Sequence, residues 1–574
     1  MKYYLTLLIS ILIAIIISSC TSQIIDMPIN SVRASDFTPS QDVISQAVFH
    51  NMTESWIVPQ KDPYALSNFQ QAYTNLISEN HKDVLTKGEQ NRLSDITLQA
   101  THYALRIFPR NEDEQWEIEL MDDIKVSYLP FNYIQLPDEE AKQFNIPTKG
   151  ASECFNEEVK YTVTYSDLEV DGMPVEDEVI DMPVLYVVWP ITKGLPSKYD
   201  FVIDYEVYIP DYSIGTKGID LSLLQLLEDE AIKIALGDRA KTKSVLDNVV
   251  KTLKGEVKTY DSFIDQYVPL ENLKIRFQLG SNIYDTYTQS DGSFSITEAI
   301  DASASFMHIL QHPRWKITPN NSTSPKSLTW GTVEEYWSEK DEIFQGVLSV
   351  PLYYETLPAI NYYYSRKHSI RTWYYDSGIR IKIAGETNAS ASASFTYSKT
   401  AAAYITVYEN YAGDPSYLNG AILHELGHFT QYGERGGYSN YVATHKLLRE
   451  SFASYVGNYL CDRYYYLLGY TNTASPQTSF TGQSRQYWTK TGTSVYSPLF
   501  VDLFDSYNQK TSAGSSYNQD MINGFSHSIV RTIAAECPTW TDVKSILSEY
   551  IGTYYSETAY NEYIAPYDYW FANN

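Results

Sequence analysis

Hydrophobic and polar residues alternate with a period of two along several stretches in the first half of the chain. The clearest are Phe201-Val-Ile-Asp-Tyr-Glu-Val-Tyr-Ile-Pro and Val184-Leu-Tyr-Val-Val-Trp-Pro. Because successive side chains of a strand point to opposite faces of a sheet, both stretches predict β-strands. Helical spacing of apolar residues replaces this alternation from Leu221 to Leu253. Residues 45–252 are therefore expected to form an N-terminal α+β domain.

A second series of alternating residues, over 253–318, contains the turn signal Asp291-Gly292 between two strand-like stretches. An Asp-Gly pair suits the tight turn of a β-hairpin. Three features of this segment resemble the carboxypeptidase regulatory-like domain of exported proteins. They are the opening Lys254-Gly-Glu-Val-Lys, the pair Pro269-Leu270 before a strand, and Ser290-Asp-Gly-Ser-Phe-Ser-Ile. The resemblance implies a small β-sandwich that acts as a spacer.

The sequence after this segment contains the pattern His-Glu-x-x-His, at His424-Glu425-x-x-His428. Residues four apart lie one turn apart on the same face of a helix, so both imidazoles can bind one metal ion. Zinc lowers the pKa of a bound water to about 7, and a carboxylate beside it can then take the proton. This spacing predicts Zn²⁺ as the cofactor, His424 and His428 as ligands, and Glu425 as the catalytic base.

The residues before this motif form a strand-like run, Ala403-Tyr-Ile-Thr-Val-Tyr, and Leu418 to Phe429 are apolar enough for a buried helix. A strand that leads into such a helix resembles the zincin metallopeptidases. The resemblance implies a zincin-like domain over 329–574, after a linker at 319–328, with a mixed sheet and active-site helices. In that superfamily an edge strand pairs with the extended substrate. Residues Tyr404 to Glu409 are either that edge strand or an interior strand.

A catalytic zinc site needs a third protein ligand, and Glu434, His445 and Glu450 are the candidates. The run Leu447-Leu-Arg-Glu-Ser-Phe-Ala-Ser-Tyr-Val predicts a second helix. A glutamate followed by two residues and an alanine resembles the third ligand of the gluzincins. The resemblance favours Glu450, with the small Ala453 allowing the two helices to approach closely.

The rival ligands fit other patterns less well, because Glu434 lacks the glycine of the metzincin motif and His445 has no matching motif. The thermolysin branch of the gluzincins has an aspartate where this chain has Ser454, which puts that branch in doubt. Gluzincins usually add a histidine or tyrosine that stabilises the oxyanion. His527 is the candidate for this catalytic role, and Tyr438 and Tyr441 are alternatives.

The N-terminus has the features of an export signal. An apolar run from Leu5 to Ile17 follows Met1-Lys2 and is shorter than the roughly 20 residues of a membrane-spanning helix. The next residues, Ser18-Ser19-Cys20, resemble the bacterial lipobox. The resemblance implies a signal peptide over 1–19, a lipid on Cys20, and a tether over 20–44. The protein is then expected to be an exported lipoprotein, held on the cell envelope through that lipid.

The composition narrows the function further. The formal net charge of −27 argues against nucleic acid as a partner, because phosphates would be repelled. No CxxC pair is present, so a cysteine-rich zinc knuckle is excluded. With Cys20 lipidated, Cys154, Cys461 and Cys537 remain, and a bridge between the last two is possible in an exported protein.

The sequence therefore predicts a multidomain α+β fold and a zinc-dependent hydrolase that cleaves peptide bonds in proteins, peptides or glycopeptides. The alternative is a surface binding protein that has kept the zincin fold and recognises glycans or peptides without cleaving them. The presence of Glu425 favours the enzyme, because the general base tends to be lost from inactive relatives. A purely structural metal site would need a fourth protein ligand.

Overall fold

The chain divides into two units, Met1–Ser45 and Gln46–Asn574, and the described residues belong to the second. The computed structural model describes residues 55–78, 85–94, 96–137, 149–150, 159–163, 169–170, 173–174, 178–211, 221–237, 253–297, 300–301, 303–319, 322–332, 344–348, 352–365, 378–384, 393–397, 402–408, 415–470, 489–491, 494–504 and 522–573. These ranges do not include the predicted signal peptide and tether, nor Cys20 and Cys154. What the sequence predicts for them stays a prediction.

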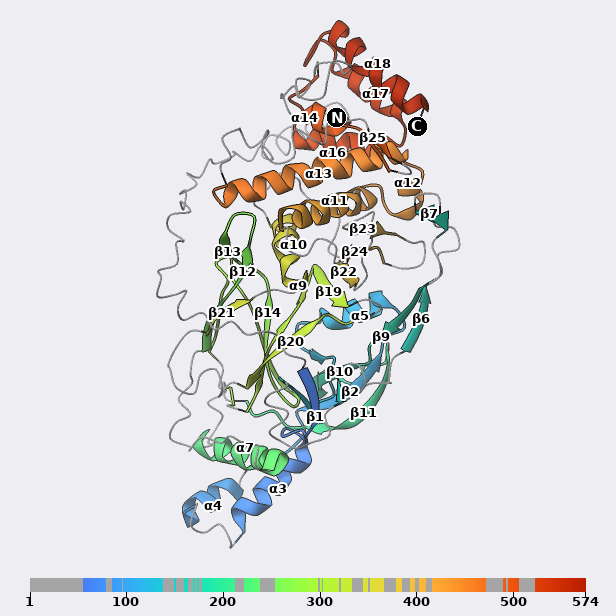
Figure 1. Cartoon of the computed structure of the whole chain (residues 1–574). Helices are drawn as coiled ribbons and strands as arrows, with labels where there is room; N and C mark the ends of the chain where they lie inside the picture. Colours follow the sequence, from blue (N-terminus) through green and yellow to red (C-terminus); the bar gives the residue numbers. More distant parts are fainter. Residues whose placement is uncertain are drawn as a thin grey trace, which may run out of the picture. The chain divides into compact units, whose positions relative to one another are not determined.

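The described residues form a mixed α+β structure, which confirms the predicted fold class (Figure 1). The first four-stranded sheet is antiparallel and has the order β11-β2-β10-β3. Its strands and the nearby helices are β2 (His102–Phe108), β3 (Lys125–Ser127), β10 (Leu185–Pro190), β11 (Asp200–Val207), α3 (Leu66–Ile77), α5 (Glu112–Glu119) and α7 (Leu221–Leu236). Strands β10 and β11 are the two alternating stretches that the sequence predicts.

The helix expected from Leu221 to Leu253 is present over its first part, as α7, which ends at Leu236. Residues 238–252 lie outside the described ranges, and Leu253 itself begins strand β12 rather than ending a helix. Apolar spacing alone does not mark this end, because the same residues can fill the buried face of a helix or of a strand.

Two further four-stranded sheets follow. One has the order β13-β12-β16, with β21 parallel to β12, and the other has the order β15-β14-β17-β20. Their strands are β12 (Leu253–Asp261), β13 (Gln266–Pro269), β14 (Lys274–Leu279), β15 (Asn282–Tyr287), β16 (Ser293–Ile296), β17 (Ser305–Ile309), β20 (Ser327–Thr332) and β21 (Phe344–Leu348).

The turn signal Asp291-Gly292 does form a turn, but the predicted hairpin is wrong. Gly292 has φ +81°, and the Asp291 carboxylate accepts a hydrogen bond from the Ser293 amide at 2.9 Å. The strands on either side, β15 and β16, belong to different sheets. The turn therefore passes the chain from one sheet to the other, because partners elsewhere in the sequence pair with each strand.

The sheet beside the His-Glu-x-x-His helix is mixed, with the order β18-β19-β22-β24-β23. Its strands are β18 (Gln311–His312), β19 (Trp315–Pro319), β22 (Ile379–Ala384), β23 (Ala393–Thr396) and β24 (Tyr404–Tyr408). Strands β19, β22 and β24 are parallel, and β23 runs antiparallel to β24. Strand β19 comes from the segment predicted to be the β-sandwich, so this sheet joins residues from both sides of the expected linker.

Of the two interpretations of the strand at residues 404–409, the interior one holds. Strand β24 pairs with β22 on one side and with β23 on the other, so it has no free edge. Among the described residues, the end strands of this sheet are β18 and β23, and β23 is the one that lies next to β24. An alternating sequence is the same in either position, so only the pairing decides.

The C-terminal part is helical. Its helices are α10 (Leu357–Tyr364), α11 (Pro415–Glu434), α12 (Tyr438–Val442), α13 (Lys446–Leu467), α14 (Leu499–Phe504), α16 (His527–Glu536), α17 (Trp540–Glu549) and α18 (Glu557–Asn573). Helices α11 and α13 lie side by side (Figure 1). None of the helices in the described part of the chain has both the length and the hydrophobicity that crossing a membrane requires.

The remaining elements are short. They are β1 (Ser55–Pro59), α4 (Lys87–Ser94), β4 (Tyr133–Pro137), β5 (Lys149–Gly150), β6 (Val159–Val163), β7 (Glu169–Val170), β8 (Met173–Pro174), β9 (Glu178–Met182), a 3₁₀ turn at Ile191–Lys193, α9 (Leu352–Glu355), β25 (Thr489–Thr491) and β26 (Ser494–Tyr496).

Candidate metal centre

Helices α11 and α13 pack antiparallel and very closely, because small residues lie where they cross. A Cβ atom on Gly427 would lie 2.8 Å from the Cα of Ala453, and a Cβ on Gly457 would lie 2.9 Å from the amide nitrogen of His424. These separations are shorter than ordinary van der Waals contact, so neither position has room for a side chain. The close approach that Ala453 predicts is therefore present.

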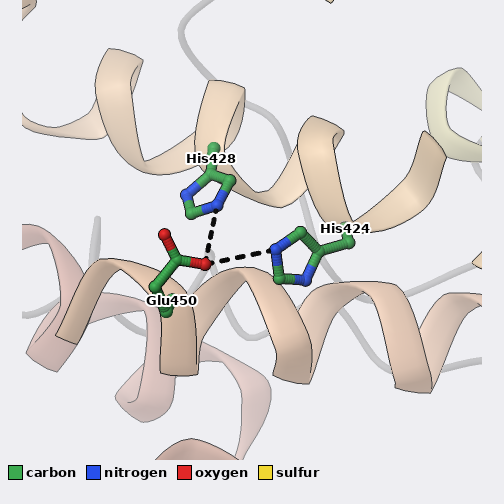
Figure 2. A group of neighbouring side chains, drawn as sticks. All are labelled: His424, His428 and Glu450. Atoms are coloured by element: carbon green, nitrogen blue, oxygen red, sulfur yellow. Dashed lines mark ion pairs between the residues drawn. The ribbon is translucent and has the colours of Figure 1, made fainter. Parts of the chain in front are cut away.

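This approach brings His424 and His428 from α11 against Glu450 from α13 (Figure 2). The Nε2 atoms of His424 and His428 lie 3.4 Å and 3.3 Å from the same oxygen of Glu450. One potential ligand atom from each residue lies within 4.8 Å of the others. These are the same three residues that the sequence predicts as metal ligands.

The donor set and its spacing fit a zinc ion. Two atoms bound at about 2.0–2.1 Å to one tetrahedral ion are about 3.4 Å apart, close to both separations at Glu450. The two histidine side chains are 11% and 8% exposed and the Glu450 side chain is 20% exposed. Three protein ligands leave one position of a tetrahedral ion for a further ligand, whereas a closed structural zinc site has four protein ligands.

Each histidine also has a partner on its second ring nitrogen. The Tyr441 hydroxyl lies 2.9 Å from Nδ1 of His428, and the Ser454 hydroxyl lies 3.5 Å from Nδ1 of His424. Partners at Nδ1 leave Nε2 as the atom that faces the ion and restrain the rotation of the ring. Ser454 stands at the position where the thermolysin branch has its aspartate. Its contact with His424 is longer than the contact of Tyr441 with His428.

The electrostatics of the group favour ionised Glu450. Burial alone would raise the pKa of this carboxyl, but the His428 and His424 rings beside it outweigh burial and hold the pKa well below its usual range. Glu425, which follows His424 on α11, is 9% exposed. The predicted base therefore sits next to one of the metal-group histidines on a buried part of the helix.

The two rival third ligands lie in other environments. Glu434 is the last residue of α11 and faces Arg531, with Nε to Oε1 at 3.7 Å. His445 caps the start of α13, where its Nδ1 accepts a hydrogen bond from the Leu447 amide at 3.2 Å. Neither belongs to the group of converging ligand atoms, which leaves Glu450 as the third member.

The structure gives His527 different neighbours from those expected of an oxyanion donor. Its Nδ1 is hydrogen bonded to the Tyr455 hydroxyl, and its ring centroid lies 4.2 Å from those of Tyr459 and Phe504. Tyr455 is five residues after Glu450 on α13, about 140° around the helix axis. Of the alternatives, Tyr441 contacts Nδ1 of His428, and the Tyr438 ring is tilted against Tyr397 with centroids 6.0 Å apart.

Two aromatic residues that belong to no recognised motif, Phe395 and Tyr397, lie beside His428 and its partner Tyr441. Phe395 of strand β23 stacks on the His428 ring, with centroids 6.2 Å apart and an interplanar angle of 13°. Tyr397 follows the same strand and contacts Tyr441 edge-on at 4.9 Å. Alternation along 393–397 is the sequence signal for this arrangement, because Phe395 and Tyr397 must share one face.

The two cysteines in the described part of the chain, Cys461 and Cys537, lie outside the metal group. Both are buried, and the possible disulfide between them is not formed. Cys461 lies behind α11, 3.7 Å from the Ser416 carbonyl oxygen, and Cys537 caps helix α16.

No protein-family profile matches the chain, and no curated protein or solved structure is significantly similar to it. The function must therefore be argued from the geometry of the His424, His428 and Glu450 group.

Proposed function

We propose that the protein is a zinc-dependent hydrolase that cleaves peptide bonds in proteins, peptides or glycopeptides. The observation that supports this most directly is the convergence of both Nε2 atoms, from His424 and His428, on one oxygen of Glu450. Two imidazoles and one carboxylate are the ligand set of catalytic zinc in peptidases.

A bound zinc ion lowers the pKa of water and polarises the carbonyl group of the substrate. The residues of the chain supply the rest of the chemistry. His424, His428 and Glu450 would hold the ion, while Glu425 would accept the proton of the attacking water and later deliver it to the leaving amine. Glu425 directly follows His424 on α11, which supports this role.

The substrate is expected to lie along strand β23. This strand runs antiparallel to β24, has an open edge in the described part of the sheet, and places Phe395 against His428. An extended peptide can add to such an edge through its main-chain hydrogen bonds. This assignment moves the predicted substrate strand from residues 404–409 to residues 393–396.

The test combines metal content with cleavage of a mixed peptide library by the full-length chain. Glu425→Gln should keep one zinc per chain and lose at least about 100-fold in cleavage rate, because only the base is removed. Glu450→Gln should lose most of the zinc. Glu434→Gln is the matched control, since this acid lies on α11 outside the metal group, and it should keep both zinc and activity.

The outcomes separate the possible functions. Normal zinc content in Glu450→Gln would reject this ligand set. Zinc in the wild-type chain without cleavage of any peptide or glycopeptide would instead favour a binding protein with a retained metal site.

We also propose that a lipid on Cys20 attaches the exported chain to the bacterial cell envelope. The Ser18-Ser19-Cys20 sequence after an apolar run supports this. Labelling of wild type and Cys20→Ser with a radioactive fatty acid tests it, and equal labelling of both would reject it.

A further inference from the structure

His428 is held on two sides by residues from different elements. Phe395 of β23 covers one face of the ring, and Tyr441 of α12 contacts Nδ1 at 2.9 Å. Tyr441 also packs edge-on against Phe395, with ring centroids 6.1 Å apart. The His424 ring contacts the His428 ring edge-on, with centroids 4.9 Å apart, and its Nδ1 contact with Ser454 is 3.5 Å long. The Nδ1 contact of His428 is therefore the shorter of the two.

Tyr441 itself makes a cation–π contact with Arg449. The Arg449 guanidinium lies over the Tyr441 ring, 5.0 Å from its centroid, and over the Tyr397 ring at 5.9 Å. Its Nη1 donates a hydrogen bond of 2.8 Å to the Tyr397 hydroxyl. A planar guanidinium can stack on one ring and hydrogen bond at its edge at the same time, which a lysine ammonium cannot do. Arg449 thus fixes both tyrosines.

The contact at Nδ1 matters for metal binding because of the histidine tautomer. A histidine that binds a metal through Nε2 carries its proton on Nδ1 and donates it to an oxygen. The Tyr441 hydroxyl is the oxygen in place for His428, and it is buried away from water. Loss of this acceptor would leave a buried N–H without a partner and free the ring to rotate.

We propose that Tyr441 and Arg449 are positioning residues that set the orientation and tautomer of His428, and that Tyr397 links this support to the end of strand β23. Arg449 directly precedes Glu450 on α13. The same turn of this helix therefore carries the third metal ligand, Glu450, and the arginine that positions Tyr441 beside His428. The proposal rests on the proposed function insofar as it takes the metal to be zinc.

The experiment measures the zinc dissociation constant of the metal-free full-length chain by competition with a chromophoric chelator. Tyr441→Phe should weaken zinc binding by about 10- to 100-fold, the range for loss of a partner of a metal-bound histidine. Arg449→Lys should weaken it less, because the charge remains but the planar clamp is lost.

A double-variant comparison shows whether the two residues act in series. Tyr441→Phe with Arg449→Lys should bind zinc no more weakly than Tyr441→Phe alone, because Arg449 acts through Tyr441. Ser454→Ala is the matched control at the other histidine, and its effect should multiply with that of Tyr441→Phe. The visible absorption of the cobalt-substituted chain should change in Tyr441→Phe, while the melting temperature of the metal-free chain shows whether the fold is intact.

Zinc affinity of Tyr441→Phe within threefold of wild type would overturn the proposal. So would an unchanged cobalt spectrum in both single variants. Absence of zinc binding by the wild-type chain would instead reject the proposed function. Zinc binding without peptide cleavage would reject the hydrolase, and the zinc affinities of the variants would still decide the proposal on Tyr441. If Tyr441→Phe fails to fold, Arg449→Lys carries the same comparison.

Discussion

The Cα atom of Gly457 lies directly against the backbone of His424, so that a Cβ at this position would be 2.9 Å from the His424 amide nitrogen and 3.0 Å from its Cα. The backbone of a helix cannot move aside as the end of a side chain can. The distance between α11 and α13 at the metal group therefore depends on a residue that provides no ligand.

We expect Gly457→Ala to push α13 away from α11. The overpacking should lower the free energy of unfolding by about 1–3 kcal/mol, and the displaced Glu450 should weaken zinc binding. Zinc titration and urea denaturation measure the two effects. Gly420→Ala, on the facing helix α11, is the control. Its Cβ would meet only the Cys461 sulfur at 3.8 Å, so this substitution should stabilise the helix slightly. Equal zinc affinity in both variants would contradict the prediction.

Ser454→Asp should tighten zinc binding about tenfold. The Ser454 hydroxyl reaches Nδ1 of His424 only at 3.5 Å, and a carboxylate there would be a stronger acceptor for the proton of a metal-bound histidine. Ser454→Asn, which has the same shape without the charge, should give a smaller gain in the same competition assay. Weaker binding in Ser454→Asp would mean that the cost of burying the carboxylate is greater than the gain.

A buried charge pair connects the N-terminal helix α5 to the mixed sheet beside the metal group. The Lys316 amine is fully buried, 3.8 Å from an oxygen of Glu119 and 4.5 Å from the Trp116 ring centroid. Glu119 has further donors in Gln115 and Gln311, whereas the Lys316 amine has no hydrogen-bond partner among the described residues.

Glu119→Gln should therefore lower the free energy of unfolding by about 3–5 kcal/mol, because it removes the carboxylate that most favours the buried lysine charge and leaves only the weaker effect of Glu112. Lys316→Met should cost less, and the double variant should recover most of the loss; urea denaturation measures all three. A larger loss in Lys316→Met than in Glu119→Gln would contradict this order.

The same lysine predicts a pH dependence. Burial lowers the pKa of Lys316, an effect that Glu119 partly opposes. At alkaline pH values below the usual lysine pKa of about 10.4, this lysine therefore binds more protons in the unfolded chain than in the folded one. Its contribution to the free energy of unfolding consequently rises with pH. Wild type should gain stability relative to Lys316→Met as the pH is raised from neutral, and a relative loss would contradict the assignment.

Gly280 and Gly237 both have φ +58°, which makes them a matched pair. A Cβ on Gly280 would collide with the Asp62 carboxylate, which accepts hydrogen bonds from the Tyr64 and Ser281 amides at 3.0 Å. A Cβ on Gly237 would meet nothing within 4 Å. Gly237→Ala should thus cost about 1 kcal/mol of strain, and Gly280→Ala at least about 1 kcal/mol more, by thermal denaturation. Equal costs would show that Asp62 moves aside freely.

Sequence reasoning was most accurate where the physical cause is local. The spacing of His424 and His428 follows from the geometry of a single helix, so any helix over these residues brings both rings to one face. The α+β class followed in the same way from alternating and helical spacing along separate segments. The predicted turn at Asp291-Gly292 is also local, but its hairpin was wrong, because β15 pairs with the preceding strand β14 while β16 pairs with the more distant β12.

The sequence by itself determined which residue types can bind a metal and which two of them share a helix face. The sequence favoured Glu450 over Glu434 only through a resemblance, and the tertiary structure decided between them, since Glu450 lies against His428 while Glu434 faces Arg531. It also decided that β24 is interior, and that Tyr441 and Arg449 lie behind His428. The physical reason is that helix spacing depends on a few covalently linked residues, whereas helix crossing and strand pairing depend on shape and hydrogen bonding between distant segments.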